Sequence, residues 1–413
     1  MLTARSAGGL FFPQRIALGF DARDVTPELT RAVGQLAAEV RSFERTEITT
    51  EKVLRLKVPR STIRRLVKQV GRELAALEEF DERSDGKEVV VPKVAVVSCD
   101  GGRIRTREPG RGRGVTLTGE KGWKETKNAA FEKMTPDPDH QGDEDPCVEL
   151  PTSFRSAKKV ANIAEKPVPD VDAPTVDRPH RVVYQGPHRV LRTAVSSMAC
   201  SDDFGPMMKR EAQRRRLFKA PLRAFLGDGL HWNWSIWKRH FSTFVPILDF
   251  IHALQYVYSA AMALRSDDVA GWALYVKHVT LCWTGQVGQV IEELKSACQE
   301  RGVDLSQKVA DDDPFKPVAD AVRYLGNNEN RMDYPGYRRL GLPVTSAPME
   351  SLIKQMNARV KGTEMFWNDP EGAESILHIR AAALSEDGRL DDYLATRPGY
   401  PFLRRSTPTS LCA

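Results

Sequence analysis

The spacing of apolar and polar residues predicts three helices near the start of the chain. Thr26 followed by Pro27 is typical of a helix N-terminus, where threonine caps a free backbone N–H and proline has none to lose. A second helix is predicted over residues 42–56, and residues 1–25 give no usable pattern. The third helix carries apolar residues at every third or fourth position, which indicates one buried face. These residues are Ile63, Leu66, Val67, Val70, Leu74 and Leu77.

The other face of this third helix is basic. Arg60, Arg64, Lys68 and Arg72 repeat every four residues, and no acid lies between positions 52 and 72. Three short helices with a basic last one resemble a helix-turn-helix, whose recognition helix enters the major groove. The alternative is a small bundle with a solvated face. Since solvated faces usually mix both signs of charge, the pattern favours DNA binding.

From residue 88 the pattern changes to short β-branched runs. Residues 89–91 and 94–97 predict a buried strand ending in Ser-Cys-Asp-Gly-Gly, and residues 103–107 alternate as the returning strand of a hairpin. Asp100 at this strand end, before two glycines that let a ligand approach, suits a metal-binding carboxylate, although a turn aspartate fits equally well. Residues 222–226 repeat the pattern and end in Gly-Asp-Gly around Asp228. One sheet would bring the two aspartates together.

The later part of the chain predicts mostly helices. Residues 134–180, rich in proline and aspartate, predict a long connection or insertion with one helix near 153–165. Trp232, Trp234 and Trp237 are interpreted as packing residues, with base stacking as the alternative. The remaining predicted helices cover residues 206–219, 244–264, 269–284, 287–300, 318–325 and 375–384.

Residues 341–362 predict the helix that completes the candidate site. Pro348 suits its first turn, and apolar residues recur at helical spacing. Glu350 and Lys354 lie on a polar stripe beside these apolar residues. Taken alone, such a pair usually marks a solvent-exposed helix face and not a catalytic group. With two strand-end aspartates, however, Glu350 suits Mg²⁺ or Mn²⁺, and two such ions can activate a water or 3′-hydroxyl against a phosphodiester. Lys354 would balance this charge or hold a DNA phosphate.

Composition restricts the class of protein. With 413 residues, 41% hydrophobic and 28% charged, the chain is globular and long enough for two or three domains. The net charge of +6 says little, but the local basic clusters suit a nucleic acid. Six cysteines without paired spacing exclude a zinc ribbon and a disulfide framework. Without a signal-peptide pattern, and with Asp249 and His252 inside the most apolar stretch, a soluble, cytoplasmic protein is expected.

Several motifs together resemble those of bacterial insertion-sequence DDE transposases of the ISKra type, relatives of the Mutator-like group. The matching segments are VVSCDGGRIRTR, WKETK, FLGDGLHWNW, ILDFIHAL, RYLGNNENRM, GLPVTSAPMES and RVKGTEMFW, between residues 26 and 383. The resemblance implies an α/β chain, in which a ribonuclease-H-like core is interrupted by an all-helical insertion and preceded by an all-α helix-turn-helix-like domain. It also implies Asp100, Asp228 and Glu350 as the catalytic, metal-binding triad.

The chain departs from the family pattern in two places. Thr-Ser-Ala-Pro-Met stands before Glu350, where Gly-Ser-Gly and two apolar residues are expected, and the N-terminal cysteine pair of some relatives is missing. The expected segments are 1–25, irregular; 26–86, DNA-binding; 87–229, first part of the core with the insertion 134–180; 230–343, helical insertion; 344–396, last part of the core; and 397–413, tail.

The resemblance implies a transposase that binds the ends of its element, cleaves the DNA with Mg²⁺ or Mn²⁺ and joins the 3′ ends to a target. The expected partners are double-stranded DNA and further copies of the chain, at the bacterial nucleoid. Two alternatives are a catalytically inactive DNA-binding relative and a ribonuclease-H-like nuclease without strand transfer. The residues expected to contact DNA are Arg60, Arg64, Lys68, Arg72, Arg103, Arg105, Lys124 and Lys361.

Asp249 and His252 match the D-x-x-H element of such transposases and, three positions apart on a predicted helix, share one face. Two interpretations stay open. In the first, the pair only fastens the helical insertion to the core. In the second, His252 contacts the DNA end or the scissile phosphate and shapes the site.

Overall fold

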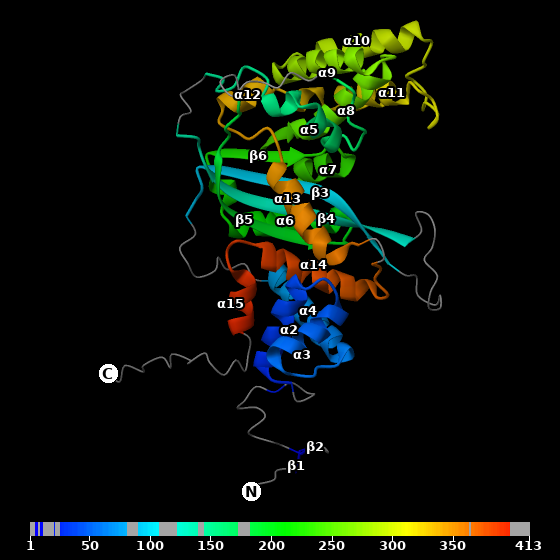
Figure 1. Ribbon diagram of the computed structural model, residues 1–413. Helices are drawn as coiled ribbons and strands as arrows, with labels where there is room; N and C mark the ends of the chain where they lie inside the picture. Colours follow the sequence, from blue (N-terminus) through cyan, green and yellow to red (C-terminus); the bar gives the residue numbers. More distant parts are fainter. Residues whose placement is uncertain are drawn as a thin grey trace, which may run out of the picture.

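The computed structural model of the protein shows a mixed α/β fold around one five-stranded sheet (Figure 1). The described residues are 5–6, 9–10, 20, 25–80, 90–106, 122–138, 144–171, 182–362 and 365–396. Apart from the sheet, a short strand pair joins β1 (Arg5–Ser6) to β2 (Gly9–Leu10). No helix in these ranges is both long enough and apolar enough to cross a bilayer.

The five-stranded sheet is mixed, with the order β5-β4-β3-β6-β7. Strand β4 is antiparallel to both of its neighbours, β5 and β3, while β6 and β7 run parallel to β3. The central strand β3 therefore joins an antiparallel half to a parallel half. The strands are β3 (Val94–Arg105), β4 (Trp123–Thr135), β5 (His188–Ser197), β6 (Leu222–Gly227) and β7 (Val245–Leu248).

The hairpin predicted around Asp100 is wrong. Strand β3 runs straight through Asp100 and both glycines to Arg105, and the returning strand is β4. Gly102 lies so close to β4 that an added Cβ would meet Oγ1 of Thr126 at 2.6 Å, so the glycine permits close pairing and not a turn. The predicted start of the strand is also wrong in part, because Val90 is 74% exposed and lies before β3; Val89 is outside the described residues.

One face of the sheet is covered by α6 (Ser201–Arg214), η4 (Leu217–Lys219) and α7 (His231–His240). Alternate residues of β3 point to this side, because successive side chains of a strand face opposite ways. They are Ala95, Val97 and Cys99, which belong to the hydrophobic cluster between this face of the sheet and the helices that cover it. The three tryptophans of α7 pack against the same cluster, which confirms their interpretation as packing residues.

The opposite face of β3 and β4 lies against α13, while α14 packs on α13 and β5. The N-terminal helices and α15 pack on α14, so the first and last helices of the chain share one hydrophobic cluster with Ile104, Ala130 and Ala194 of the sheet. Gly71 of α4 leaves no room for a side chain against Ser375 of α14. These helices are α2 (Pro27–Glu39), α3 (Phe43–Leu54), α4 (Arg60–Phe80), α13 (Ala347–Val360), α14 (Pro370–Leu384) and α15 (Arg389–Thr396).

The third cluster joins the parallel end of the sheet to the remaining helices, which lie at the top in Figure 1. Strand β3 contributes Val94 and Val96, and the helices around α8 and α9 supply most of the rest. Most of these helices lie in the chain between β7 and α13. The exceptions are η2 and α5, which precede β5. Its members are η2 (Thr152–Arg155), α5 (Ala157–Ile163), α8 (Phe250–Ala263), α9 (Asp268–Trp283), α10 (Val287–Glu300), α11 (Lys316–Asn328), η5 (Glu329–Arg331) and α12 (Tyr334–Arg339).

Most predicted helices are confirmed with shifted ends. Thr26 caps α2, its side chain accepting from the amide of Leu29 over 3.1 Å. The apolar face of α4 ends at Leu74, because Leu77 is 38% exposed. The prediction of one helix over 244–264 is wrong at its start, where β7 forms before α8. Strand β5 and helices α12 and α15 were not predicted.

Candidate active site

Three aspartates lie level with one another on neighbouring strands of the sheet. Strands β3, β6 and β7 are parallel neighbours; β6 and β7 end just before their aspartates, whereas β3 continues past Asp100 to Arg105. Asp100 follows Cys99, which pairs with Gly227, and Asp228 comes directly after Gly227. Asp249 follows the last residue of β7, and its amide donates to the carbonyl of Gly227 over 3.0 Å. The prediction that Asp100 and Asp228 end neighbouring strands is confirmed for the strands, which are neighbours, and for Asp228, which follows β6; it is wrong for Asp100, because β3 continues to Arg105.

Asp100 and Asp228 are both half-buried, and the charge of Asp228 disfavours the charged form of Asp100. Burial, followed by the negative charge of Asp228, raises the pKa of Asp100 to about 7. Burial also raises the pKa of Asp228, although hydrogen bonds from the amide of Leu230 and the side chain of Asn233 oppose the change. A cation between the two carboxylates would relieve both effects, because it favours their charged forms.

The loop that carries Asp228 is held from two sides. Oδ1 of Asp228 accepts hydrogen bonds from the amide of Leu230, over 2.9 Å, and from Nδ2 of Asn233 in α7. The hydroxyl of Tyr324 in α11 donates to the carbonyl of Asp228 over 2.6 Å. Gly229 has a φ of 92°, a conformation that favours glycine, and Tyr324 fills the space where a side chain would be. The helical insertion thus fixes the position of Asp228.

Asp249 lies before α8 and caps it, so it is not a residue within the helix as predicted. Its side chain is 1% exposed, and its Oδ1 accepts from the amides of Ile251 and Ser346, each over 3.1 Å. Its Oδ2 accepts from the hydroxyl of Ser346, the residue just before α13. Asp249 therefore fastens the start of the helix that carries Glu350 to the carboxyl end of β7.

His252 lies among the carboxylates. Its Nε2 is 3.8 Å from Oδ2 of Asp249, too far for a direct hydrogen bond, and its side chain is 23% exposed. Burial by itself would lower the pKa of His252, but the surrounding negative charges raise it above its usual value. In decreasing order of effect, these charges belong to Asp249, Asp228, Asp100 and Glu350. A protonated His252 therefore offsets part of the negative charge of this cluster.

Glu350 lies in the first turn of α13, where a carboxylate is favoured by the helix dipole. Its Oε2 is 3.7 Å from Nζ of Lys354, one turn later, whose side chain is exposed. Because the charge of Glu350 acts on His252, the glutamate belongs to the same electrostatic neighbourhood as the aspartates. The charges of Asp100, Asp228 and Glu350 thus all act on His252, although the three carboxylates, as placed, do not form a group able to hold a metal ion.

Carboxylates supply the candidate ligands at the predicted metal position, and such oxygen ligands suit Mg²⁺ or Mn²⁺. Asp100 and Asp228 fit a divalent cation, because their burial and mutual repulsion favour one. Asp249 does not fit as a ligand, since both of its oxygens accept hydrogen bonds. Across the described ranges, no three His, Cys, Asp or Glu side chains are close enough together, as placed, to hold a metal ion.

The basic ridge predicted on α4 is partly neutralised by acids from elsewhere in the chain. Arg60 forms ion pairs with Glu44 at 3.2 Å and Glu47 at 3.1 Å. Lys68 and Arg72 both pair with Glu371 at the start of α14, and Lys68 also contacts Asp369. Arg64 alone of the four forms no ion pair within the described part of the chain. The sequence argument that this face lacks acids is therefore wrong, while DNA binding by these residues stays a prediction.

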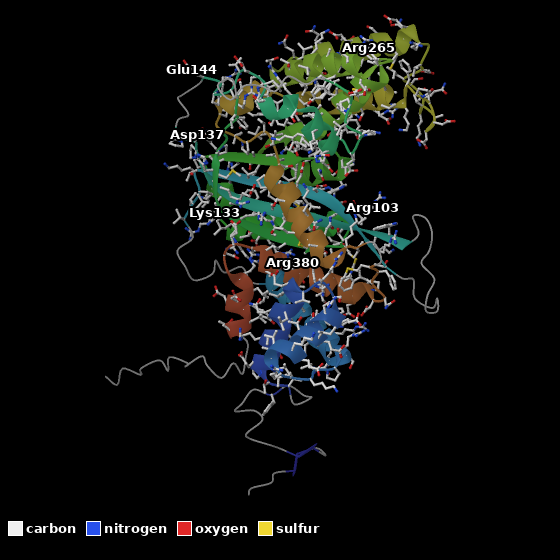
Figure 2. The ribbon with its side chains drawn as sticks, in the orientation of Figure 1. Arg103, Lys133, Asp137, Glu144, Arg265 and Arg380 are labelled. Carbon is white, nitrogen blue, oxygen red and sulfur yellow. The ribbon has the colours of Figure 1, made fainter. Side chains whose placement is uncertain are left out.

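The other residues predicted to contact DNA lie at the end of the sheet beyond Asp100, two of them against Trp123. Arg105 lies over the Trp123 ring at 4.7 Å and Lys361 approaches it at 5.7 Å. Lys124 is exposed, and Arg103 projects near the far end of β3 and β4 (Figure 2). These four cations form a group separate from the ridge on α4.

Several residues that shape the site were not singled out from the sequence. Asn233 and Ser346 hold Asp228 and Asp249, and Tyr324 holds the loop after β6. Each lies inside or beside a segment that the sequence analysis quoted, but none differs in type from an ordinary surface or packing residue. The partners of Tyr324 and Ser346 lie 96 and 97 positions away in the chain, so no local pattern shows these roles.

No family model matches this chain, and a search of curated proteins finds no similar one. The geometry and chemistry of the site are therefore what bear on the function.

Proposed function

We propose that this chain is a metal-dependent DDE-type transposase with a ribonuclease-H-like core. The observation that carries the proposal is the pair Asp100 and Asp228, which lie level with each other on the neighbouring parallel strands β3 and β6, half-buried, with the charge of Asp228 disfavouring that of Asp100. The sheet supports it, since three antiparallel strands followed by two parallel ones are what such a core requires. The helices inserted between β7 and α13 agree with the split core that the resemblance implies.

In this proposal Asp100 and Asp228 hold the metal ions, and Glu350 supplies the third carboxylate from α13. Bound divalent ions would lower the pKa of a water or 3′-hydroxyl and stabilise the leaving oxygen of a phosphodiester. Asn233 and the amide of Leu230 orient Asp228, while Asp249 holds the start of α13. His252 offsets part of the negative charge before metal binds. The helices α2–α4 are proposed as the DNA-binding unit, of helix-turn-helix type.

The proposal is tested with a supercoiled plasmid that carries the open reading frame and the DNA on both sides of it. With Mg²⁺, the intact chain should cut at discrete positions in the flanking DNA, and EDTA should prevent cutting. Asp100→Asn, Asp228→Asn and Glu350→Gln keep the side-chain shape but remove the charge, so each should reduce cutting at least 100-fold, which is about 2.7 kcal/mol, with DNA binding retained. Asp304→Asn, an exposed aspartate outside the site, is the control and should cut normally.

The same assay separates the alternatives. A nuclease without strand transfer would cut the flanks but give no joined products with a second target plasmid. An inactive relative would bind the DNA without cutting it. Normal cutting by all three amide variants would disprove the metal-dependent mechanism.

A further inference from the structure

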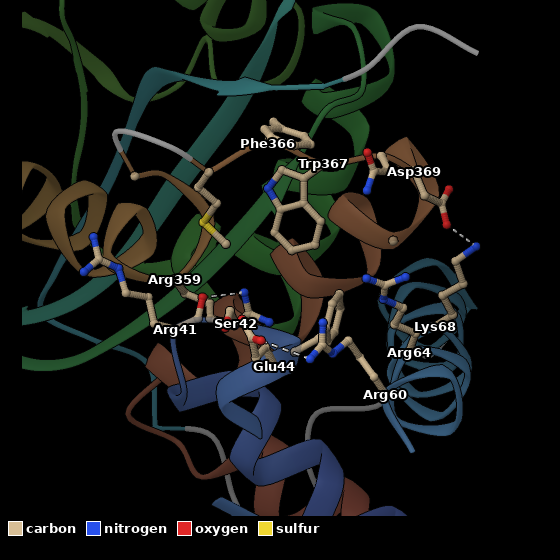
Figure 3. Close-up of a pocket in the computed structure, with 15 residues that line it drawn as sticks. Arg41, Ser42, Glu44, Arg60, Arg64, Lys68, Arg359, Phe366, Trp367 and Asp369 are labelled. Atoms are coloured by element: carbon tan, nitrogen blue, oxygen red, sulfur yellow. Dashed lines mark hydrogen bonds and ion pairs between the residues drawn. The ribbon is translucent and has the colours of Figure 1, made fainter. Parts of the chain in front are cut away.

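A pocket of about 650 Å³ lies between the N-terminal helices and the segment that follows α13 (Figure 3). Its walls come from the start of α3, the first half of α4, the end of α13, Gly362 and residues 365–372. The pocket is outside the candidate active site and shares no residue with it. Its size lies within the range of pockets that take a small organic ligand.

The charge of the pocket is positive. Five cationic and two acidic side chains line it. Both acids are already paired, Glu44 with Arg60 at 3.2 Å and Asp369 with Lys68. Arg41 and Arg64 lie on different sides of the pocket, are exposed, and form no ion pair with any described residue (Figure 3). An anion entering the pocket would therefore meet two guanidinium groups without a carboxylate partner, which suit phosphate because they can donate two parallel hydrogen bonds.

A third arginine adds charge from behind the wall. Arg359 is 1% exposed, and its Nε donates to the carbonyl of Ala37 over 2.7 Å. Its Nη2 has no hydrogen-bond partner, and no described carboxylate pairs with it. Its guanidinium lies 5.3 Å from the ring centre of Phe43 and 5.6 Å from that of Trp367. A buried cation without a counter-charge is costly and makes the pocket more attractive to an anion.

The rest of the wall is apolar and aromatic. Phe43 and Trp367 meet edge to face with ring centres 5.9 Å apart, and Met365 continues the same surface. Arg64 lies over the Phe43 ring at 5.8 Å, so a guanidinium and an aromatic ring already adjoin at the entrance. Phosphate-binding arginines beside aromatic rings are the combination that proteins use for single-stranded nucleic acid. A double helix is too wide for this pocket, so DNA can enter it only as an unpaired nucleotide.

Two elements lead from the carboxylates to this pocket. Helix α13 carries Glu350 in its first turn and Arg359 in its last. The last part of strand β3 leads from Asp100 to Arg105. The carbonyl oxygen of Arg105 accepts a hydrogen bond from the amide of Trp367 over 2.7 Å. Five strand residues span roughly 17 Å, the length of about five stacked nucleotides at about 3.4 Å each. A DNA strand held at the carboxylates can therefore reach the pocket within a few nucleotides.

We propose that this pocket receives one unpaired nucleotide of the DNA strand that leads away from the active site, with Arg41 and Arg64 holding the two phosphates that flank it. The inference rests on the proposed function and adds to it a preference for DNA whose end is single-stranded.

The test measures DNA binding by the intact chain in EDTA, so that cutting does not interfere. Fluorescence anisotropy compares a blunt duplex with the same duplex carrying an unpaired extension of about six nucleotides, long enough to span the path above. Extensions at the 5′ and the 3′ end are tried separately. With one polarity, the extended duplex should bind about tenfold more tightly than the blunt one, equivalent to one stacked base at about 1.4 kcal/mol.

The double variant Arg41→Ala/Arg64→Ala should bring the ratio of affinities for extended and blunt DNA to below about twofold. This holds whether or not its affinity for blunt DNA also changes. Both side chains are exposed, so their truncation should leave folding within about 0.5 kcal/mol. Arg155→Ala/Arg265→Ala removes the same charge from exposed positions outside the pocket, Arg265 lying at the opposite end of the molecule (Figure 2), and should keep the ratio.

Three outcomes would overturn the inference: no preference for either extension in the wild type, an equal loss in the control variant, or complete competition by inorganic phosphate at the concentration at which a free mononucleotide competes. The last would show a simple phosphate site. These results are independent of the cutting assay. If the chain cuts the plasmid but shows no preference for the extended duplex, the proposed function stands and the role of the pocket is disproved. If it prefers the extended duplex but does not cut, the role of the pocket stands and the proposed function is disproved.

Discussion

The carboxylate of Asp249 accepts hydrogen bonds from both the amide and the hydroxyl of Ser346, 97 positions later in the chain. Asp249 follows β7, and Ser346 precedes α13. The position of Glu350 relative to the aspartates therefore depends on a contact between two residues that do not themselves face the metal position. This relationship separates the residues that would carry the chemistry from those that hold them.

Replacing Ser346 tests this separation. Ser346→Ala removes one of the donors to a buried carboxylate, which should cost about 1–3 kcal/mol of folding stability. Because α13 is then less firmly held, cutting should fall further than the loss of folded protein explains. Thermal unfolding and the plasmid assay measure the two effects. The matched control is Ser351→Ala, an exposed position on the same helix; an equal loss of cutting there would contradict the role of Ser346.

Asp100 should destabilise the metal-free protein at neutral and alkaline pH. Its pKa is about 7 in the folded chain and ordinary, near 3.8, when unfolded, so the folded state binds its proton more tightly. Stability therefore falls as the pH rises from about 4 to about 7 and levels off above that. Asp100→Asn removes this penalty, and at pH 8 in EDTA the variant should be more stable than the wild type by on the order of 3 kcal/mol.

At pH 4 the same two proteins should differ little, because Asp100 is then largely neutral in the folded state and close to half neutral in the unfolded one. Urea unfolding at the two pH values measures the difference. Burial also raises the pKa of Glu132 to about 7, so ionisation of Glu132 lowers the folding stability of the protein over the same pH range. Glu132→Gln is therefore measured in parallel. A gain for Asp100→Asn that is equal at both pH values would show that charge is not its cause.

His252 should set the pH at which the carboxylates become available. Its positive charge opposes the burial that raises the pKa values of Asp100 and Asp228. In His252→Asn these carboxylates should hold their protons to higher pH. The pH midpoint of Mn²⁺-dependent cutting should then rise by about one unit.

His231→Asn, an exposed histidine near Asp228, serves as the control and should keep the wild-type profile. Melting temperatures decide between the two interpretations of Asp249 and His252. If His252→Asn lowers the melting temperature by several degrees and leaves the pH profile unchanged, then the histidine only fastens the insertion.

Glu371 should weaken DNA binding by occupying two cations of α4. It pairs with Lys68 and Arg72, but all three side chains are partly exposed, so the ion pairs contribute little to folding. Glu371→Gln should therefore leave the melting temperature nearly unchanged. If the ridge binds DNA, duplex affinity should rise, and the salt slope should steepen by about one for each additional DNA phosphate that the protein neutralises. Glu300→Gln, an acid at the end of α10, should change neither, and an unchanged slope in Glu371→Gln would place the ridge outside the DNA interface.

The sequence was informative where one element decided the outcome. The apolar periodicity of α4 identified its buried face as far as Leu74, and the repeated strand-aspartate-glycine pattern located Asp100 and Asp228 on neighbouring strands. It failed where the outcome depended on a distant partner. The glycines after Asp100 were predicted to form a turn, because the sequence near them does not show that the returning strand is β4, which starts only at Trp123.

Charge patterns failed for the same reason. The basic ridge was predicted to lack acids because Glu371 lies about 300 positions later, and Asp249 was predicted within a helix because its bonds to Ser346 cross 97 positions. Such contacts form only when the chain has folded, so a local window cannot contain them.

The close approach of Gly71 to Ser375 also has a consequence during synthesis. The apolar face of α4 is covered by α14, which leaves the ribosome about 300 residues later. Until then the N-terminal helices expose that face, so they do not form a finished unit in the nascent chain. A chain that ends before α14 would therefore leave this apolar face open to aggregation and proteolysis.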